Sequence, residues 1–262
     1  MVSKGAYACD FVRVKRYGDR YKVIYFSRPV RLPDGGEASG RRGVEAGGRA
    51  ESNLSRARAR VQELALCNDW EWFATLTLDG ARYDRHNLDK FRADLAQWVR
   101  NQRRLRGDAV RYLIIPEQHK DGAWHMHGLI GGLPAARLRP FEASEHLPYS
   151  ILDQLRKGVQ VYDWPAYARK FGWVTLTAVR DRHRVASYVT KYVTKTMTAA
   201  TGVEAGRHLY YASRGLREAE QIWEGGMDGV AIRWDWQGEY CKIKWVDEEG
   251  LQEVMNHATI PY

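Results

Sequence analysis

RYLIIPEQHKDGAWHMHGLIGG, residues 111–132, is the stretch of the chain that decides the fold. Two apolar runs flank the tetrapeptide HKDG at 119–122, and an Asp-Gly pair between such runs is a strong signal for a β-hairpin turn. The stretch therefore predicts two neighbouring antiparallel strands.

Further strands and helices are predicted on both sides of this hairpin. Upstream, EWFATLTLD (71–79) has the aromatic and β-branched residues of a buried strand, and residues 84–106 carry apolar side chains at helical spacing. Downstream, residues 163–170 predict a short helix, GWVTLTAVR (172–180) a strand, and residues 183–198 another helix. This βαββαβ order is typical of an α+β, ferredoxin-like or RRM-like antiparallel sheet. We expect helices on one face and a second face free for a ligand.

Extensions are predicted at both ends of this core. YACDFVRVKRYGDRYKVIYFSR (7–28) alternates like a hairpin that turns at Gly18 and Asp19, and residues 31–55, rich in Gly, Ala and Ser, predict a mobile linker. The expected domains are an N-terminal β-hairpin extension with its linker at 1–55, a core domain at 56–200 with an insertion at about 133–160, and a C-terminal extension at 201–262.

Composition narrows the classes of partner and activity. The chain has a formal charge of +9, and its fifteen tyrosines and ten tryptophans interleave with arginine, which favours an anionic partner with exposed bases. No apolar run reaches about 18 residues and the N-terminal residues lack a secretory apolar core, so we expect a cytoplasmic protein without membrane insertion. The Walker A pattern GxxxxGK(S/T) is missing, which argues against an ATP-driven motor.

A pair of histidines forms the first candidate site. His125 and His127 are two residues apart in a predicted strand, so both imidazoles face one side of the sheet. Histidines at this spacing can chelate a metal ion. The alternative is a structural pair, which would need hydrogen-bond partners of its own.

The neighbouring strand offers a third ligand, Glu117. If residues 120–122 form a three-residue loop with a left-handed glycine, Glu117 lies directly across from His125 on the same face; a two-residue loop would place it on the opposite face. His119 shares the strand parity of Glu117 and is an additional or alternative ligand. Two imidazoles and one carboxylate leave positions open on an octahedral ion, which favours Mg²⁺ or Mn²⁺ but leaves zinc as an alternative.

SYVTKYVTK (187–195), on the predicted C-terminal helix, contains the second candidate site. The residues that share one helical face, at positions i, i+3, i+4 and i+7, are Tyr188, Lys191, Tyr192 and Lys195. A tyrosine can attack a phosphodiester where a metal ion and lysine stabilise the phenolate and the charge on phosphorus. In the alternative interpretation the tyrosines pack on the sheet and the lysines extend to water.

Three motifs, in the order of the family, resemble those of the HUH endonucleases. They are FATLTLD (73–79), WHMHGLI (124–130) and YVTKYVTK (188–195). The middle motif matches the His-hydrophobic-His pattern that names the family, and the last resembles the two-tyrosine form of some phage initiators. The chain thus resembles the replication-associated proteins that start rolling-circle replication of small phages and plasmids.

This resemblance implies a function for each candidate site. It implies that His125, His127 and Glu117 bind the divalent ion that polarises the scissile phosphate of single-stranded DNA at a replication origin. The carboxylate assignment depends on the seven-residue gap before His125, a gap whose length varies among such proteins.

The resemblance also implies a tyrosine mechanism. Tyr188 or Tyr192 would attack the phosphorus, forming a 5′-phosphotyrosine link and freeing a 3′-hydroxyl to prime synthesis. Lys191 and Lys195 would position or neutralise phosphate. With two tyrosines, one can hold a strand end while the other cuts, so joining needs no outside energy. A host helicase and the replication machinery are the implied partners.

Two other functions are compatible with the same residues. A transposase or conjugative relaxase would use the same nicking chemistry, although relaxases usually place the tyrosine before the histidines. A non-catalytic RRM-like protein would instead stack single-stranded nucleic acid on its sheet and use the histidines structurally.

Overall fold

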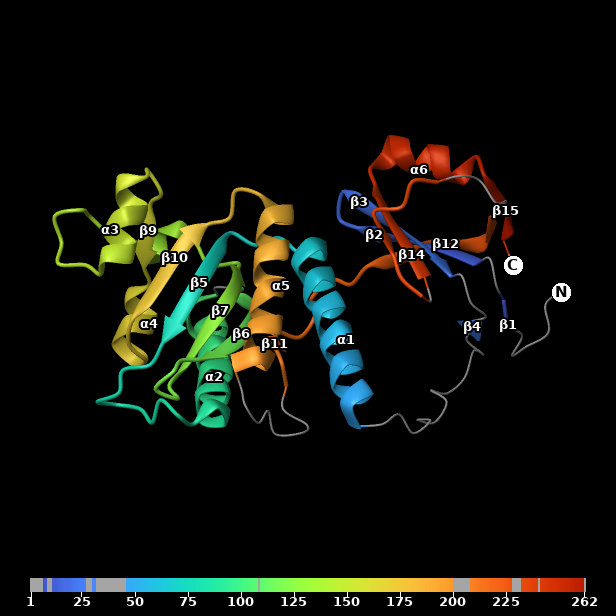
Figure 1. The fold of residues 1–262 in the computed structure, drawn as a ribbon. Coiled ribbons are helices and arrows are strands. Elements are labelled where there is room, and N and C mark those ends of the chain that lie inside the picture. The colour runs from blue at the N-terminus through green and yellow to red at the C-terminus, as the bar shows by residue number, and fades with distance from the viewer. Residues whose placement is uncertain are drawn as a thin grey trace. The chain divides into compact units, whose positions relative to one another are not determined.

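The computed structural model describes residues 7–8, 11–26, 30–31, 46–107, 109–199, 208–227, 232–239 and 241–261. By internal contacts the chain divides into two compact units (Figure 1). The central unit is Ala46–Leu216, and the terminal unit combines Met1–Glu45 with Arg217–Tyr262.

The central unit is built on a seven-stranded sheet. Its strands are β5 (Trp72–Thr77), β6 (Arg111–Gln118), β7 (Trp124–Gly131), β8 (Arg139–Pro140), β9 (Val161–Asp163), β10 (Val174–Ala178) and β11 (Tyr211–Ala212). They run in the order β11-β6-β7-β5-β10-β9-β8, with neighbouring strands antiparallel. The predicted α+β class is confirmed. The inner order β6-β7-β5-β10 is consistent with the expected ferredoxin-like arrangement.

Five helices and one short 3₁₀ turn complete the described part of the central unit. They are α1 (Ala46–Cys67), α2 (Leu88–Arg106), η1 (Ala135–Arg137), α3 (Tyr149–Arg156), α4 (Pro165–Lys170) and α5 (Arg182–Ala199). The ends of α2 follow local chemistry. The Asn87 side chain caps the first turn by accepting a hydrogen bond from the Lys90 N–H, and Gly107 ends the helix in a left-handed conformation at φ 71°.

One face of the sheet packs against α2 and α4. Met126 of β7 is fully buried there with Phe91 of α2 and Tyr167 of α4. Trp124 and Ile130 belong to the same core, so the strand alternation expected of the histidine motif is confirmed. The two histidines therefore face the other side of the sheet.

The expectation that this other face is free is wrong. Helix α5 contacts β6 and β7 there, and α1 packs along α5. Val189 and Val193 of α5 are fully buried, as is Val61 of α1. Part of the sheet face is thus covered by apolar helix packing.

Part of the predicted linker is also wrong. Helix α1 begins at Ala46, inside the segment 31–55, and continues to Cys67. Residues 32–45 lie outside the described part of the chain.

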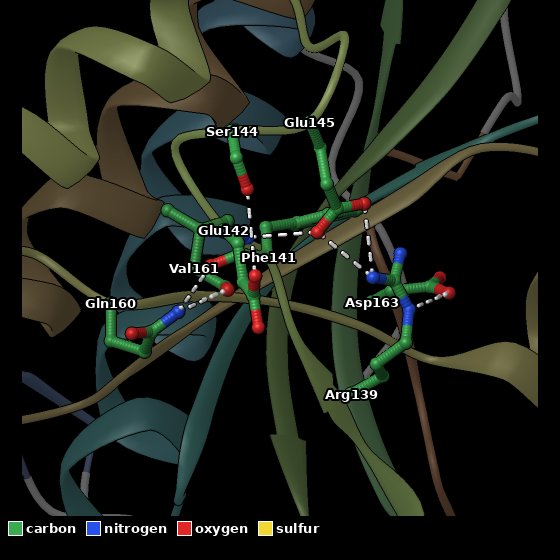
Figure 2. Close-up of polar contacts among 8 residues, drawn as sticks. All are labelled: Arg139, Phe141, Glu142, Ser144, Glu145, Gln160, Val161 and Asp163. Atoms are coloured by element: carbon green, nitrogen blue, oxygen red, sulfur yellow. Dashed lines mark hydrogen bonds and ion pairs between the residues drawn. The ribbon is translucent and has the colours of Figure 1, made fainter.

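The predicted insertion folds into a small substructure beside β10, containing η1, β8 and α3. Figure 2 shows its polar contacts: the Arg139 guanidinium donates to both oxygens of Glu145, at 2.9 and 3.0 Å, and its Nε lies 3.8 Å from an oxygen of Asp163. The Gln160 amide donates to the carbonyls of Phe141 and Val161, each at 3.0 Å. These contacts fix the segment that carries α3.

The terminal unit joins the two ends of the chain in one six-stranded sheet. Its order is β13-β14-β3-β2-β12-β15. The elements are β2 (Phe11–Tyr17), β3 (Arg20–Phe26), β12 (Glu220–Met227), β13 (Trp236–Gln237), β14 (Cys241–Val246), α6 (Glu248–Met255) and β15 (Ala258–Pro261), with β1 (Tyr7–Ala8) and β4 (Val30–Arg31) as a separate two-stranded sheet.

The hairpin predicted at the N-terminus is confirmed. It turns at Gly18, which has a φ of 67°. Segments predicted as two separate extensions therefore share one sheet and one apolar core, which contains Val12, Val23 and Leu251. Among the described residues, no helix is long and apolar enough to cross a membrane.

Candidate active site

The β6–β7 hairpin has the register that a three-residue loop requires. Glu117 pairs with His125 across the two strands. The His119 N–H donates to the Ala123 carbonyl at 2.9 Å, and Gly122 adopts a φ of 83°. The carboxylate and the imidazoles thereby lie on the same face of the sheet.

Two threonines of β5 hold the histidines in place. Thr77 Oγ1 lies 2.9 Å from Nδ1 of His125, and Thr75 Oγ1 lies 3.1 Å from Nδ1 of His127. Each threonine is the direct cross-strand partner of its histidine. Because the hydroxyls occupy both Nδ1 atoms, Nε2 is the atom that each ring has available for a ligand. The sequence marked FATLTLD as a motif but did not assign this positioning role.

Glu117 makes its closest contact with the second histidine, not with its cross-strand partner. Its Oε2 lies 2.8 Å from Nε2 of His127, and both side chains are almost buried. The exposed ring of His119 stacks on His125 with ring centroids 3.7 Å apart. The carboxylate and three imidazoles are thus gathered at one end of the hairpin.

Burial and neighbouring cations keep His125 neutral. Desolvation, followed by the charges of His119, His127 and Arg85, lowers the pKa of His125 to about 4. A neutral imidazole at pH 7 keeps the lone pair that metal binding requires. Arg85 was not singled out by the sequence, because nothing local connects it to the hairpin.

Helix α5 brings the tyrosines to the same place. The Tyr192 ring stacks on the His127 ring at 4.4 Å with an interplanar angle of 15°. The hydroxyls of Tyr188 and Tyr192 are hydrogen-bonded at 2.8 Å, and both rings contact Phe73 of β5. The two sites that the sequence presented separately therefore form one cluster.

The lysines of the tyrosine motif are less closely defined. Lys191 is exposed on α5, one position before Tyr192. Lys195 is also on α5, but its side chain lies outside the described residues.

The environment of Tyr192 favours the neutral phenol. Desolvation raises its pKa first, followed by the hydrogen bond and the charge interaction with Tyr188 and by the charge of Glu117. A phenolate at Tyr192 therefore requires positive charge nearby to form at neutral pH.

A cavity of 330 Å³ opens beside the tyrosines over β5 and β10. Its lining residues are Phe73, Thr75, Gln154, Thr175, Thr177, Tyr188 and Tyr192. Hydroxyl and amide groups of this kind can hydrogen-bond a polar ligand next to the tyrosine hydroxyls. The sequence missed Gln154 because α3 belongs to the insertion, which carried no recognisable motif.

No group of three or more His, Cys, Asp and Glu side chains is spaced to hold a metal ion within the described parts of the chain. The carboxylate of Glu117 is directed at His127 Nε2, as its 2.8 Å distance shows. Metal binding at this cluster therefore stays a prediction.

Comparison with known proteins identifies the central unit. Residues 71–197 match a family of replication-associated proteins, the ORF2 family, over a span that contains β5, the β6–β7 hairpin and both tyrosines. No curated protein and no solved structure matched the chain. The predicted resemblance to rolling-circle initiators is confirmed, and the family indicates a role in starting DNA replication. Residues 71–197 thus carry the signature of the replication-associated protein ORF2 family, a family of rolling-circle replication initiators.

Proposed function

We propose that this protein nicks and rejoins single-stranded DNA at a replication origin through Tyr188 or Tyr192. One observation carries the proposal: the two hydroxyls are 2.8 Å apart, and the Tyr192 ring lies flat against His127. Nucleophile candidates and metal-ligand candidates thus occupy the same few ångströms of the sheet face.

The ligand set fits a hard divalent ion, Mg²⁺ or Mn²⁺. Nε2 of His125 and Nε2 of His127 are oriented by the threonine hydroxyls bound to Nδ1, and Oε2 of Glu117 lies 2.8 Å from the second of these nitrogens. When bound, the ion would polarise the scissile phosphate and stabilise negative charge there. His119, stacked on His125, is an alternative ligand.

The tyrosine pair can carry out a balanced transfer. The hydroxyl oxygen of one tyrosine forms a bond to phosphorus as the bond from phosphorus to the 3′-oxygen breaks. The products are a 5′-phosphotyrosine and a free 3′-hydroxyl, and the phenol proton leaves as the bond forms. Because the hydroxyls are hydrogen-bonded, the second phenol can stabilise charge on the first. Lys191 and Lys195 would neutralise phosphate charge beside them.

Two nucleophiles also account for rejoining. While one tyrosine holds the 5′ end, the other can cut the newly made strand, and the released 3′-hydroxyl can then attack the first phosphotyrosine. The phosphodiester energy is conserved in the protein link, so no nucleotide cofactor is required. We infer that a host helicase and polymerase supply the rest of the replication cycle, in the host cytoplasm.

The test is a gel assay with labelled single-stranded DNA from the origin region of the protein's own replicon. With Mn²⁺ or Mg²⁺ the wild-type protein should give a nick and a covalent protein–DNA adduct, and EDTA should abolish both. The Tyr188→Phe, Tyr192→Phe double variant should bind the DNA but form no adduct. Tyr149→Phe, at an exposed tyrosine of α3, is the matched control and should cut normally.

The other candidate functions give different outcomes. A DNA-binding protein without nuclease activity would bind the strand and leave it intact with either metal. A transposase or relaxase would cut other sequences and ignore the origin. An adduct that persists in the double variant would show that neither tyrosine is the nucleophile.

A further inference from the structure

A groove rich in arginine lies between α2 and the β6–β11 edge of the sheet. It has a volume of 640 Å³ and is lined by Arg92, Ala96, Val99, Arg100, Arg103, Val110, Arg111, Tyr112, Ala212, Ser213 and Arg214. Five of these described residues are arginines, and none of them is acidic. We call it the arginine groove.

The charges of the arginine groove lack acidic partners within the described parts of the chain. Arg100 donates to the Gln97 amide oxygen at 2.6 Å, and the Arg92 guanidinium lies over the Tyr211 ring at 5.6 Å. None of the five arginines forms an ion pair with a carboxylate among the described residues, whereas Arg82 and Arg139 do. Cations placed together without counter-charges repel one another, so an anion that bridges them would be stabilised.

The groove is held open by backbone pairing. The Tyr112 N–H donates to the Ser213 hydroxyl at 3.0 Å, and the Ser213 N–H donates to the Tyr112 carbonyl at 2.9 Å. These bonds extend the pairing of β11 with β6 and fix the residue that follows, Arg214. The far wall is the rigid helix α2, so both sides of the groove have a defined position.

The shape and chemistry fit a chain of phosphates better than a small anion or bases. Arg92 and Arg103 are eleven positions apart on α2, or about 16 Å along the helix axis, enough to face several phosphates of one strand. Guanidinium groups bind phosphate in a bidentate manner. Bases would need open aromatic faces, but Tyr112 is only partly exposed and the Tyr211 ring is already covered by Arg92.

The groove is separate from the tyrosine cluster. Tyr112 and Val110 pack on the core beneath α2, whereas the histidines and α5 are on the opposite face of the sheet. Two of its lining elements, β11 and the following Arg214, also lie beyond the span 71–197 matched by the family.

We propose that the arginine groove is a second nucleic-acid site, which binds the phosphate backbone of DNA outside the segment being cut. The choice of DNA as the polyanion rests on the proposed function. The contact is with phosphates, so it is independent of sequence, and it would add affinity without taking part in the cleavage chemistry.

The test measures DNA binding by the full-length protein in EDTA, where no cleavage is expected. Fluorescent oligonucleotides of unrelated sequence, one single-stranded and one duplex, are titrated at several salt concentrations. For Arg103→Gln, Arg214→Gln, affinity should fall about tenfold or more, and the slope of log K against log salt should decrease by about 1 to 2. The form of DNA with the larger loss is the one that the groove holds.

A matched control is Arg104→Gln, Arg156→Gln, which removes the same charge at exposed arginines outside the groove. It should leave the salt slope unchanged. A charge-preserving variant, Arg103→Lys, Arg214→Lys, should retain most of the slope, which a purely structural role of the arginines would not predict. If the groove variant and the control bind both oligonucleotides equally, the groove is not a DNA site.

Nicking separates this proposal from the proposed function. At saturating concentrations of a short origin oligonucleotide, the groove variant should form the tyrosine adduct at the wild-type rate. A wild-type protein that never cuts refutes the nicking mechanism but leaves the binding comparison intact. Equal binding by the groove variant and control refutes the groove and leaves the nicking result intact.

Discussion

Two threonine hydroxyls determine how the histidines of β7 can act. For Nε2 of an imidazole to bind a metal ion, its Nδ1 must carry the proton and donate it to a neighbour. Thr77 and Thr75 stand 2.9 and 3.1 Å from the Nδ1 atoms of His125 and His127. They therefore select the tautomer that directs Nε2 toward a ligand.

Removing these hydroxyls should weaken metal binding and leave the fold intact. We expect Thr75→Val and Thr77→Val each to lower Mn²⁺ affinity by about tenfold to a hundredfold, because the ring can rotate and change tautomer. Isothermal titration with Mn²⁺ measures this directly. Thr175→Val, a threonine of β10 paired with Thr75, is the control and should bind normally. Unchanged affinity in both β5 variants would refute the positioning role.

His125 should make the stability of the metal-free protein depend on pH. Its pKa is about 4 in the folded chain against an ordinary 6.5, so between these values the unfolded chain binds a proton that the folded chain does not. The stability that this group contributes is complete above about pH 6.5 and is lost as pH falls toward 4.

Urea unfolding in EDTA at pH 7 and pH 5 tests this dependence. The wild-type midpoint should fall further between the two pH values than that of His125→Gln, which lacks the titrating group. His146→Gln, at an exposed histidine of the insertion, should behave like the wild type. A pH dependence that is the same in all three proteins would show that His125 does not titrate in this way.

At the level of the element, the β6–β7 hairpin depends on a close backbone contact at Gly128. A Cβ built on this glycine would lie 2.1 Å from the carbonyl oxygen of Leu113 and 2.7 Å from Cα of Ile114. Both neighbours are backbone atoms of β6, which cannot move without shifting the strand that carries Glu117. The glycine follows His127 directly, so the same contact sets the spacing of the site.

Gly128→Ala should therefore disturb the whole hairpin. We expect a loss of about 4 kcal/mol or more in unfolding free energy, or a failure to fold, because the added methyl group meets rigid backbone. Gly158→Ala is the comparison: its φ of 74° disfavours alanine, but no atom lies within 4 Å of the added carbon, so the cost should be about 1–2 kcal/mol. Urea denaturation gives both values. Equal losses would show that the backbone contact is not limiting.

Elements with local signals could be predicted, and those held by tertiary contacts could not. The Asp-Gly turn and strand alternation predicted the register of the β6–β7 hairpin, and with it the common face of Glu117 and His125. The start of helix α1 could not be predicted because its first turns contain two glycines, which have low helix propensity. Its apolar side chains, such as Val61, are buried in the pairing of α1 with α5, which no local pattern shows.

At the scale of the whole molecule, the long-range pairings account for the rest of the difference. The N-terminal hairpin was predictable because its turn is local. Its pairing with β12 joins Arg13 to Glu224, whose side chains are hydrogen-bonded at 3.1 Å across 211 positions. Hydrophobic periodicity carries no information about such pairs, so the sequence alone predicts two separate extensions. The stacking of Tyr192 on His127 was likewise implied only by the resemblance.

The shared core of the terminal unit should make its two sequence segments unfold together. Val23 of β3 is fully buried and packs in one cluster with Met227 of β12 and Leu251 of α6. Val23→Ala leaves a cavity in that cluster, with a cost of about 1–3 kcal/mol. Hydrogen exchange should then accelerate in residues 11–26 and in residues 220–255 alike, because neither segment can bury its apolar face alone.

Val174→Ala, in the core of the central unit, is the matched control for this last prediction. It should accelerate exchange in the sheet formed by β5, β7 and β10 and leave residues 11–26 unchanged, since Val174 belongs to a different core cluster. Mass spectrometry of exchanged peptides resolves all of these segments. Faster exchange in residues 11–26 alone after Val23→Ala would mean that the hairpin is independent of the C-terminal strands, and that their shared sheet is not a cooperative unit.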